Sequence, residues 1–189
     1  MVDNRWLESE AGRVLLQQER GQLARALDRV FGDQIVQISV WGPSALFTEV
    51  ARTQVAFLVD VNEEPGVNAV MAPNRLAILT DSIDAVFLPH TLERHHDPHG
   101  VLREVHRILR PDGKVIILGF NPFSWWGLRH RLSPRGFPRG LLRQITKRRL
   151  SDWLTLLNLT IETVYPCYAS GAKGRGMQLI HQLQLFASS

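Results

Sequence analysis

Two apolar runs in the second half of the chain constrain its fold most strongly. Residues 84–88 and 114–120 are almost continuously apolar, which is typical of strands that are covered on both faces. Between them, Asp97-Pro98 indicates a helix start, and apolar residues recur at helical spacing over 101–109. A strand, a helix and a second strand in this order form the repeating unit of a parallel sheet.

The same alternation extends over the rest of the chain. Helices are predicted over 7–31, 44–51 and 151–157, and strands over 35–41, 54–61 and 159–168. A short third strand is expected within 67–79, a turn at 111–113, and a left-handed residue at Asn158. This order predicts an α/β fold: a Rossmann-like three-layer sandwich with a mostly parallel sheet and helices on both faces. Residues 177–186 fit a strand or a helix, so the last strand is present, atypical or missing.

Positive charge is concentrated in one segment. The 189 residues include 22 Lys+Arg and 18 Asp+Glu, a net charge of +4. Nine of the basic residues and none of the acidic ones lie within 113–151. Aromatic residues alternate with arginines there, which suits binding of RNA or of an anionic membrane surface through 129–149. A lid over an acceptor site and an edge with solvated arginines are the other two interpretations.

Composition narrows the class of protein. An apolar content of 44% allows a real core and excludes a disordered chain. Cys167 is the only cysteine, which excludes an internal disulfide. The polar N-terminus is unlike a secretory signal, and the uncharged run 115–128 is too short to span a bilayer. We expect a cytoplasmic protein with a single domain over 1–189, made of a helical segment (1–32), the sheet and a basic aromatic cap (121–150). The oligomeric state stays open.

Ligands of parallel α/β sheets bind at the carboxyl ends of the strands, near the switch in strand order. The segments to inspect therefore follow Trp41, Asp60, Leu88 and Phe120. His90 lies just beyond the strand that ends at Leu88, so it is a candidate base or substrate ligand. The alternative is a loop histidine with one backbone hydrogen bond. The three histidines within 95–99 lack the spacing of a metal site, and we predict no metal.

Residues 81–122 resemble the fourth strand, the following helix and the fifth strand of class I S-adenosylmethionine-dependent methyltransferases, and most closely the bacterial type-11 group. That group carries the signature FD-V…LEH…D-P…L-E--RVLKPGG. The matching positions are Asp84, Leu92, Glu93, Asp97, Pro98, Leu102, Glu104, Arg107, Leu109, Pro111 and Gly113. The resemblance implies S-adenosylmethionine as the cofactor and methyl transfer to an acceptor that the sequence does not identify. Arg94 stands where the family has the histidine of LEH.

The glycine-rich cofactor turn of that family is degenerate in this chain. The aligned stretch is QISVWGPSA, in which Gln37 stands at the position of the family's acid. Ser39, Trp41 and Pro43 stand at or near the glycine positions, and Gly42 remains. A side chain hinders close approach of the backbone, and an indole can occupy the pocket itself.

The resemblance implies a set of candidate cofactor contacts, with Asp60 on the ribose hydroxyls and Asn74 as the nearest polar substitute for the family's adenine-binding acid. The full set is Ser39, Gly42, Asp60, Asn74, Leu88 and Pro89. His90 is the candidate base. Two functions follow: a methyltransferase, or an inactive protein on the same scaffold that uses its basic aromatic segment to bind a partner.

Overall fold

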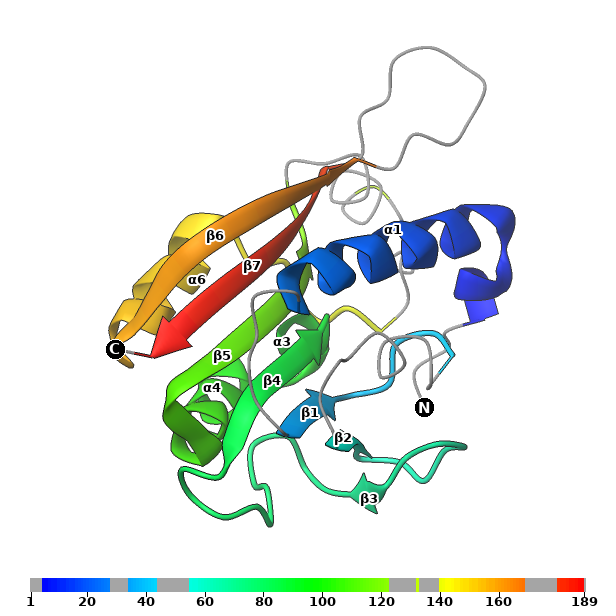
Figure 1. Ribbon diagram of the computed structural model, residues 1–189. Helices are drawn as coiled ribbons and strands as arrows, with labels where there is room; N and C mark the ends of the chain where they lie inside the picture. Colours follow the sequence, from blue (N-terminus) through cyan, green and yellow to red (C-terminus); the bar gives the residue numbers. More distant parts are fainter. Residues whose placement is uncertain are drawn as a thin grey trace.

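One mixed β-sheet organises the described part of the chain. The computed structural model describes residues 5–27, 34–43, 55–122, 132, 140–168 and 180–188, with backbone only for 162–168 and 180–188. The sheet has the strand order β3-β2-β1-β4-β5-β7-β6 (Figure 1). This observation confirms the predicted α/β fold.

Five parallel strands form the half of the sheet that matters for the site. They are β1 (Gln34–Ile38), β2 (Val55–Asp60), β3 (Ala69–Val70), β4 (Ile83–Pro89) and β5 (Leu109–Phe120). β1 pairs with β2 on one side and with β4 on the other. The chain therefore changes direction across the sheet between β1 and β4, and this switch point is where ligands of such sheets bind.

The other end of the sheet is antiparallel. β7 (Ile180–Ser188) lies between β5 and β6 (Leu159–Tyr168) and runs antiparallel to both. Within the predicted range 177–186, the described residues from Ile180 onward form a strand, and residues 177–179 lie outside the described part. The last strand is therefore present.

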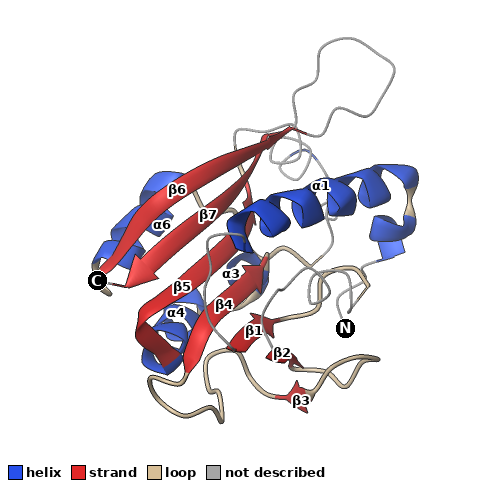
Figure 2. Cartoon of the chain, in the orientation of Figure 1, coloured by secondary structure: helices blue, strands red, loops and turns tan. Residues whose placement is uncertain are grey.

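Helices cover both faces of the sheet (Figure 2). A short 3-10 helix, η1 (Arg5–Glu8), precedes α1 (Glu10–Leu27) on one face. The other face carries α4 (Pro98–Ile108) and α6 (Lys147–Thr155), and α3 (Thr91–Arg94) follows the end of β4. None of the described helices is both long and apolar enough to cross a membrane.

Alternation along the strands builds two apolar cores. Under α1, Leu15 and Leu23 pack with Phe87 of β4 and Ile116 of β5. On the opposite face, the neighbouring residues of the same strands pack against α4 and α6. That second core includes Val36, Val86, Leu88, Val101, Leu102, Val105, Val115, Ile117, Trp153 and Leu154.

Several boundaries differ from their predictions. The strand predicted over 35–41 ends at Ile38, and the helix predicted from residue 7 begins as an α-helix at Glu10. Helix α6 begins after Thr146, whose hydroxyl accepts a hydrogen bond from the Arg149 amide, and Ser151 lies inside the helix instead of capping it. Strand β5 begins at Leu109, and the predicted turn 111–113 is an irregularity within it, because Ile83 pairs with Leu109 whereas Ala85 pairs with Lys114. Asn158 is left-handed as predicted, with φ 58°. The predicted helix 44–51 lies outside the described residues.

Two residues of the family signature, Glu104 and Arg107, connect α4 to the segment before β4. Glu104 accepts a hydrogen bond from the Leu76 amide, and Arg107 donates to the carbonyls of Leu76 and Ile78. Arg107 also pairs with Glu104 at 2.9 Å. These contacts fasten the segment before β4 to α4, so this part of the signature reports the fold and leaves the chemistry open.

Asp97 caps α4 as predicted, because its side chain accepts a hydrogen bond from the Gly100 amide at 2.8 Å. Replacing Asp97 by alanine leaves that amide without its partner. We expect Asp97→Ala to lower the free energy of unfolding by about 1 kcal/mol in urea denaturation. Asp97→Asn retains a capping oxygen and is the control. Equal losses in both variants would contradict the capping role.

Candidate functional site

The turn after β1 has two residues with a left-handed backbone, and one of them is not a glycine. Ser39 has φ 80° and Gly42 has φ 70°, both in the left-handed region. A left-handed backbone costs a non-glycine residue roughly 1 kcal/mol or more and persists where its surroundings enforce it. The Ser39 amide donates to the Val59 carbonyl of β2 at 2.8 Å. The turn is therefore held in this shape from the neighbouring strand.

Asp60, at the end of β2, braces the same turn. Its Oδ2 accepts a hydrogen bond from the Val40 amide at 2.7 Å, and its Oδ1 accepts from the Asn62 amide at 3.0 Å. The Asn62 side-chain amide donates to the same Oδ1 at 3.4 Å. A carboxylate offers about four acceptor positions, so these three contacts leave about one position for a ligand hydroxyl.

Trp41 fills the crevice at the switch point. Its side chain is only 1% exposed. The ring centroid lies 4.2 Å from that of His90, after β4, and 5.9 Å from that of Phe120, at the end of β5. The indole Nε1 donates to Glu19 Oε2 of α1 at 2.8 Å. The indole thus spans the carboxyl ends of three strands and is tied to the helix above them.

His90 joins two buried carboxylates. Its Nδ1 lies 2.8 Å from Glu93 Oε2, and its Nε2 lies 3.1 Å from Glu19 Oε1. His90 and Glu19 are 0% exposed and Glu93 is 2% exposed. Glu93 Oε1 also accepts a hydrogen bond from the Phe120 amide. Both ring nitrogens can donate only when the imidazole is protonated, so this geometry favours imidazolium. We call Glu19, Trp41, His90 and Glu93 the buried polar cluster.

Charge interactions set the protonation of the buried polar cluster. Burial alone lowers the pKa of His90, but the hydrogen bonds and charges of Glu19 and Glu93 raise that pKa above its ordinary value. Burial raises the pKa of Glu93, opposed by its hydrogen bonds from His90 and the Phe120 amide. His90 therefore holds a proton at higher pH than a free histidine does.

Arg94 holds the β1 turn from the opposite side. Its Nη1 donates to the Val40 carbonyl at 2.8 Å, and its guanidinium carbon lies 5.7 Å from the Trp41 ring centroid. The pKa of Arg94 lies below its ordinary value, because the effect of burial outweighs the opposing effect of the negative charges of Asp60 and Glu64. Val40 thus has its amide bound by Asp60 and its carbonyl bound by Arg94.

The structure brings most of the predicted site residues together. Ser39, Gly42 and Asp60 surround the β1 turn, and Leu88 and Pro89 are buried at the end of β4 directly before His90. The Thr91 hydroxyl joins the two strand ends by donating to the Ile38 carbonyl at 2.5 Å.

Asn74 occupies a different place. It lies against the first turn of α4, with its Cβ 3.2 Å from a Cβ built on Gly100. His90 is not a loop histidine with a single backbone hydrogen bond, because its ring is bound on both sides by carboxylates.

The sequence analysis did not predict that Glu19 and Glu93 contact His90. Glu19 falls four residues after Leu15 and four before Leu23 on the apolar stripe of α1. A carboxylate on a buried stripe is a signal, because such a charge requires a partner. Glu93 belongs to the matched signature, but nothing in the local pattern shows that it contacts His90.

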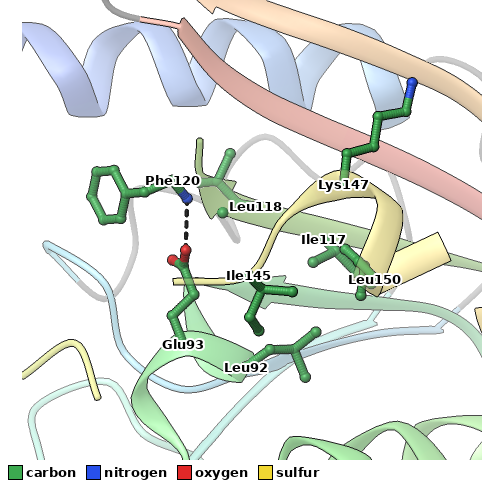
Figure 3. Close-up of a pocket in the computed structure, with 9 residues that line it drawn as sticks. Leu92, Glu93, Ile117, Leu118, Phe120, Ile145, Lys147 and Leu150 are labelled. Carbon is green, nitrogen blue, oxygen red and sulfur yellow. Dashed lines mark hydrogen bonds between the residues drawn. The ribbon is translucent and has the colours of Figure 1, made fainter. Parts of the chain in front are cut away.

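A pocket lies on the α6 side of Glu93 (Figure 3). Its empty volume is about 370 Å³ and its wall is mostly apolar, formed by Leu92, Glu93, Ile117, Leu118, Gly119, Phe120, Ile145, Lys147 and Leu150. Figure 3 shows the Glu93 carboxylate directed at the Phe120 amide and the Lys147 side chain directed away from it. The pocket therefore adjoins the buried polar cluster but presents few polar groups of its own.

Two residues beside the turn fit S-adenosylmethionine. Asp60 has about one acceptor position left for a ribose hydroxyl. Gln37 shares its strand face with Ile35, beneath α1, and its buried Oε1 has no hydrogen-bond partner among the described residues. A ligand ammonium would satisfy that oxygen. The Trp41 indole is the obstacle, because it occupies the crevice between β1 and β4.

The buried polar cluster makes stability depend on pH. Because the pKa of His90 in the folded chain is raised above 6.5, protonated His90 stabilises the fold below pH 6.5, and this contribution is lost as pH rises through the raised value. The pKa of Glu93 is also raised, so its contribution changes in the same direction from pH 4.5 upward. We expect the free energy of unfolding to fall with pH above 6.5, by up to about 1.4 kcal/mol per pH unit for one proton.

Urea denaturation between pH 6 and 9 measures this slope. His90→Asn is the matched variant, because asparagine tolerates the left-handed backbone of His90 (φ 54°) but does not titrate. A slope that is unchanged in His90→Asn would contradict the assignment.

Two solved structures of similar shape are distant from this chain in sequence. An S-adenosylmethionine-dependent methyltransferase from Thermotoga maritima has a TM-score of 0.70 and 17% identity, covering 100% of this chain and 99% of that one. The 1,6-didemethyltoxoflavin-N1-methyltransferase of Burkholderia thailandensis, solved with S-adenosylhomocysteine, has a TM-score of 0.67 and 17% identity, covering 97% of this chain and 80% of that one. These likenesses show the fold.

Sequence comparison gives one curated relative and one family. The uncharacterised protein YafS of Escherichia coli K12 is 43% identical over 91 residues, which are 47% of this chain and 38% of YafS. The match therefore spans well under half the length of that relative. Residues 20–117, about half of the chain, match the methyltransferase domain family. With the strand order and the signature of residues 81–122, this match shows that the chain belongs to the class I S-adenosylmethionine-dependent methyltransferase domain family.

Proposed function

We propose that this protein binds S-adenosylmethionine at the carboxyl ends of β1 and β2 and transfers its methyl group to an acceptor. The observation that carries the proposal is the left-handed Ser39 at the head of the β1 turn, with Asp60 bound to the next amide. A strained backbone at a switch point is where a functional site is expected. Membership of the methyltransferase domain family supports the same activity.

The chain's own residues would hold the cofactor and exclude water. Asp60 would accept a hydrogen bond from a ribose hydroxyl while keeping the Val40 amide in place. Gln37 would accept a hydrogen bond from the amino group through its unpartnered Oε1. S-adenosylmethionine supplies an electrophilic methyl group on a sulfonium. The protein's main contribution is therefore to align an acceptor with that methyl group.

A base role for His90 stays a prediction, and its contacts set a condition on it. His90 accepts a proton only after losing the one that Glu19 and Glu93 stabilise. Its Nε2 must also separate from Glu19 Oε1, which lies 3.1 Å away. The base would thus operate above the raised pKa, with the Glu19 side chain moved away from the ring.

Isothermal titration with S-adenosylhomocysteine tests cofactor binding. We expect heat of binding at ligand concentrations up to about 1 mM. Asp60→Asn keeps an oxygen for the Val40 amide but loses the charge, so we expect affinity to fall about tenfold. Glu63→Gln, an exposed acid just after β2, is the control with unchanged affinity. Absence of heat with the wild type would overturn the proposal, and equal affinity in Asp60→Asn would remove Asp60 from the site.

A second candidate function is a binding protein that no longer uses the cofactor. The buried Trp41 at the switch point favours it. Most of the basic aromatic segment lies outside the described residues. In its described part, Lys147, Arg148 and Arg149 are exposed on the first turn of α6. Cations at a helix N-terminus oppose the helix dipole, so an anionic partner there would relieve the repulsion.

Salt-dependent binding tests this second function. For a polyanion bound through 129–149, affinity should fall steeply as salt rises. Retention on RNA and on vesicles containing anionic lipid would be compared from 50 to 200 mM salt, with Lys147→Gln/Arg148→Gln/Arg149→Gln as the variant. If the triple variant loses binding to RNA alone or to the vesicles alone, that result identifies the class of partner. If neither RNA nor the vesicles bind, the three cations are solvated residues at a helix end and the second function is wrong.

A further inference from the structure

We infer that Trp41 is an internal plug of the cofactor site, latched by Glu19, and that the cofactor binds only when the indole leaves the crevice. This inference rests on the proposed function and concerns the regulation of the same site. It follows from the position of the ring, from its hydrogen bond and from the turn that carries it.

The position of the ring puts it in competition with any ligand of the switch point. The indole contacts His90 beyond β4 and Phe120 at the end of β5, with ring centroids 4.2 and 5.9 Å away. On the far side it meets Trp6 of η1 at 5.8 Å. The side chain is 1% exposed, so protein atoms cover it on every side. A ligand that crosses from β1 to β4 must therefore take the volume of the indole.

The latch is the hydrogen bond from Trp41 Nε1 to Glu19 Oε2, at 2.8 Å. Indole has a single donor and no acceptor, so this contact fixes the ring orientation. Glu19 is itself fixed, because its other oxygen contacts His90 Nε2. A hydrogen bond to a buried charged group is among the stronger ones. The hydrogen bond to Glu19 therefore stabilises the state in which the indole occupies the cofactor site.

The turn provides a means of opening. Trp41 is followed by Gly42, which is left-handed and free to change φ. A Cβ added at Gly42 would lie 2.9 Å from a Leu16 side-chain carbon of α1. Gly42 therefore keeps α1 and the turn in close contact, and displacement of Trp41 would be transmitted to that helix. Asp60 and Arg94 hold the Val40 peptide groups before the ring, so the ring can move while the ribose end of the site stays in place.

Two substitutions at Trp41 distinguish the effect of the hydrogen bond to Glu19 from the effect of the space that the indole fills. Trp41→Phe keeps an aromatic ring but lacks the N–H, and Trp41→Gly also empties the crevice. Removing a hydrogen bond to a charged group shifts the closed–open equilibrium by about 10-fold or more. We expect the affinity for S-adenosylhomocysteine to rise about tenfold in Trp41→Phe and further in Trp41→Gly. Trp153→Phe, a buried tryptophan on the opposite face of the sheet, is the control with unchanged affinity.

The outcomes distinguish this inference from the proposed function. Equal binding by wild type, Trp41→Phe and Trp41→Gly supports cofactor use but overturns the plug. Binding by Trp41→Gly without binding by wild type supports the plug and overturns cofactor use by the unaided protein. Absence of binding in all three overturns both.

A spectroscopic measurement covers the case in which Trp41→Gly does not fold. The full chain labelled with 5-fluorotryptophan gives a Trp41 resonance, identified by its loss in folded Trp41→Phe. Saturating S-adenosylhomocysteine should move this resonance toward the position of exposed fluorotryptophan. A Trp41 resonance that stays buried while titration shows binding would contradict the plug.

Discussion

The contact of one buried histidine with two buried carboxylates governs the arrangement of this site. His90 directly follows β4, Glu19 lies on α1, and Glu93 lies on α3 and also binds the Phe120 amide at the end of β5. Taking carboxylates out of water costs several kcal/mol each unless they are paired. These partners therefore have to stay together, and they fix α1 over the carboxyl edge of the sheet. The orientation of Trp41 follows, because its indole binds the oxygen of Glu19 that His90 does not use.

The turn after β1 is held in shape by the strands and loops around it. Ser39 has a left-handed backbone, and Asp60 and Arg94 bind the two sides of Val40. The next residue, Trp41, is buried with its indole against His90 and Phe120, at the carboxyl edge of the sheet where ligands of such folds bind. The sheet is that of a methyltransferase domain, whereas the loss of the family's glycine motif stays a prediction.

The fold was predictable to a large extent because its signals are local. Apolar runs such as 84–88 identify buried strands, and Asp97-Pro98 identifies the start of α4, which the Gly100 contact confirms. The start of α6 was predicted wrongly because Thr146 and Ser151 are both good caps, and the cations after Thr146 disfavour a helix start there. Strand β7 stayed ambiguous because its place between β5 and β6 depends on partners distant in the sequence.

The site was predictable only in part, because its contacts are long-range. The alignment of the β1 turn with the family's motif singled out Asp60 and Trp41, which the structure places at the carboxyl edge of the sheet, and their roles toward a cofactor stay predictions. The pairing of Glu19 with His90 joins residues far apart in the chain, and no local period reveals it. What the sequence does contain is a carboxylate on the apolar stripe of α1, between Leu15 and Leu23. Such a residue predicts a buried partner without identifying it.

A crystal structure of the full chain grown with S-adenosylhomocysteine would show directly whether Trp41 yields its place to the cofactor. We expect the ribose on Asp60, the Trp41 indole turned out from between His90 and Phe120, and Glu19 separated from the indole N–H. A bound ligand at the ends of β1 and β2 with the indole still buried and bound to Glu19 would contradict this expectation.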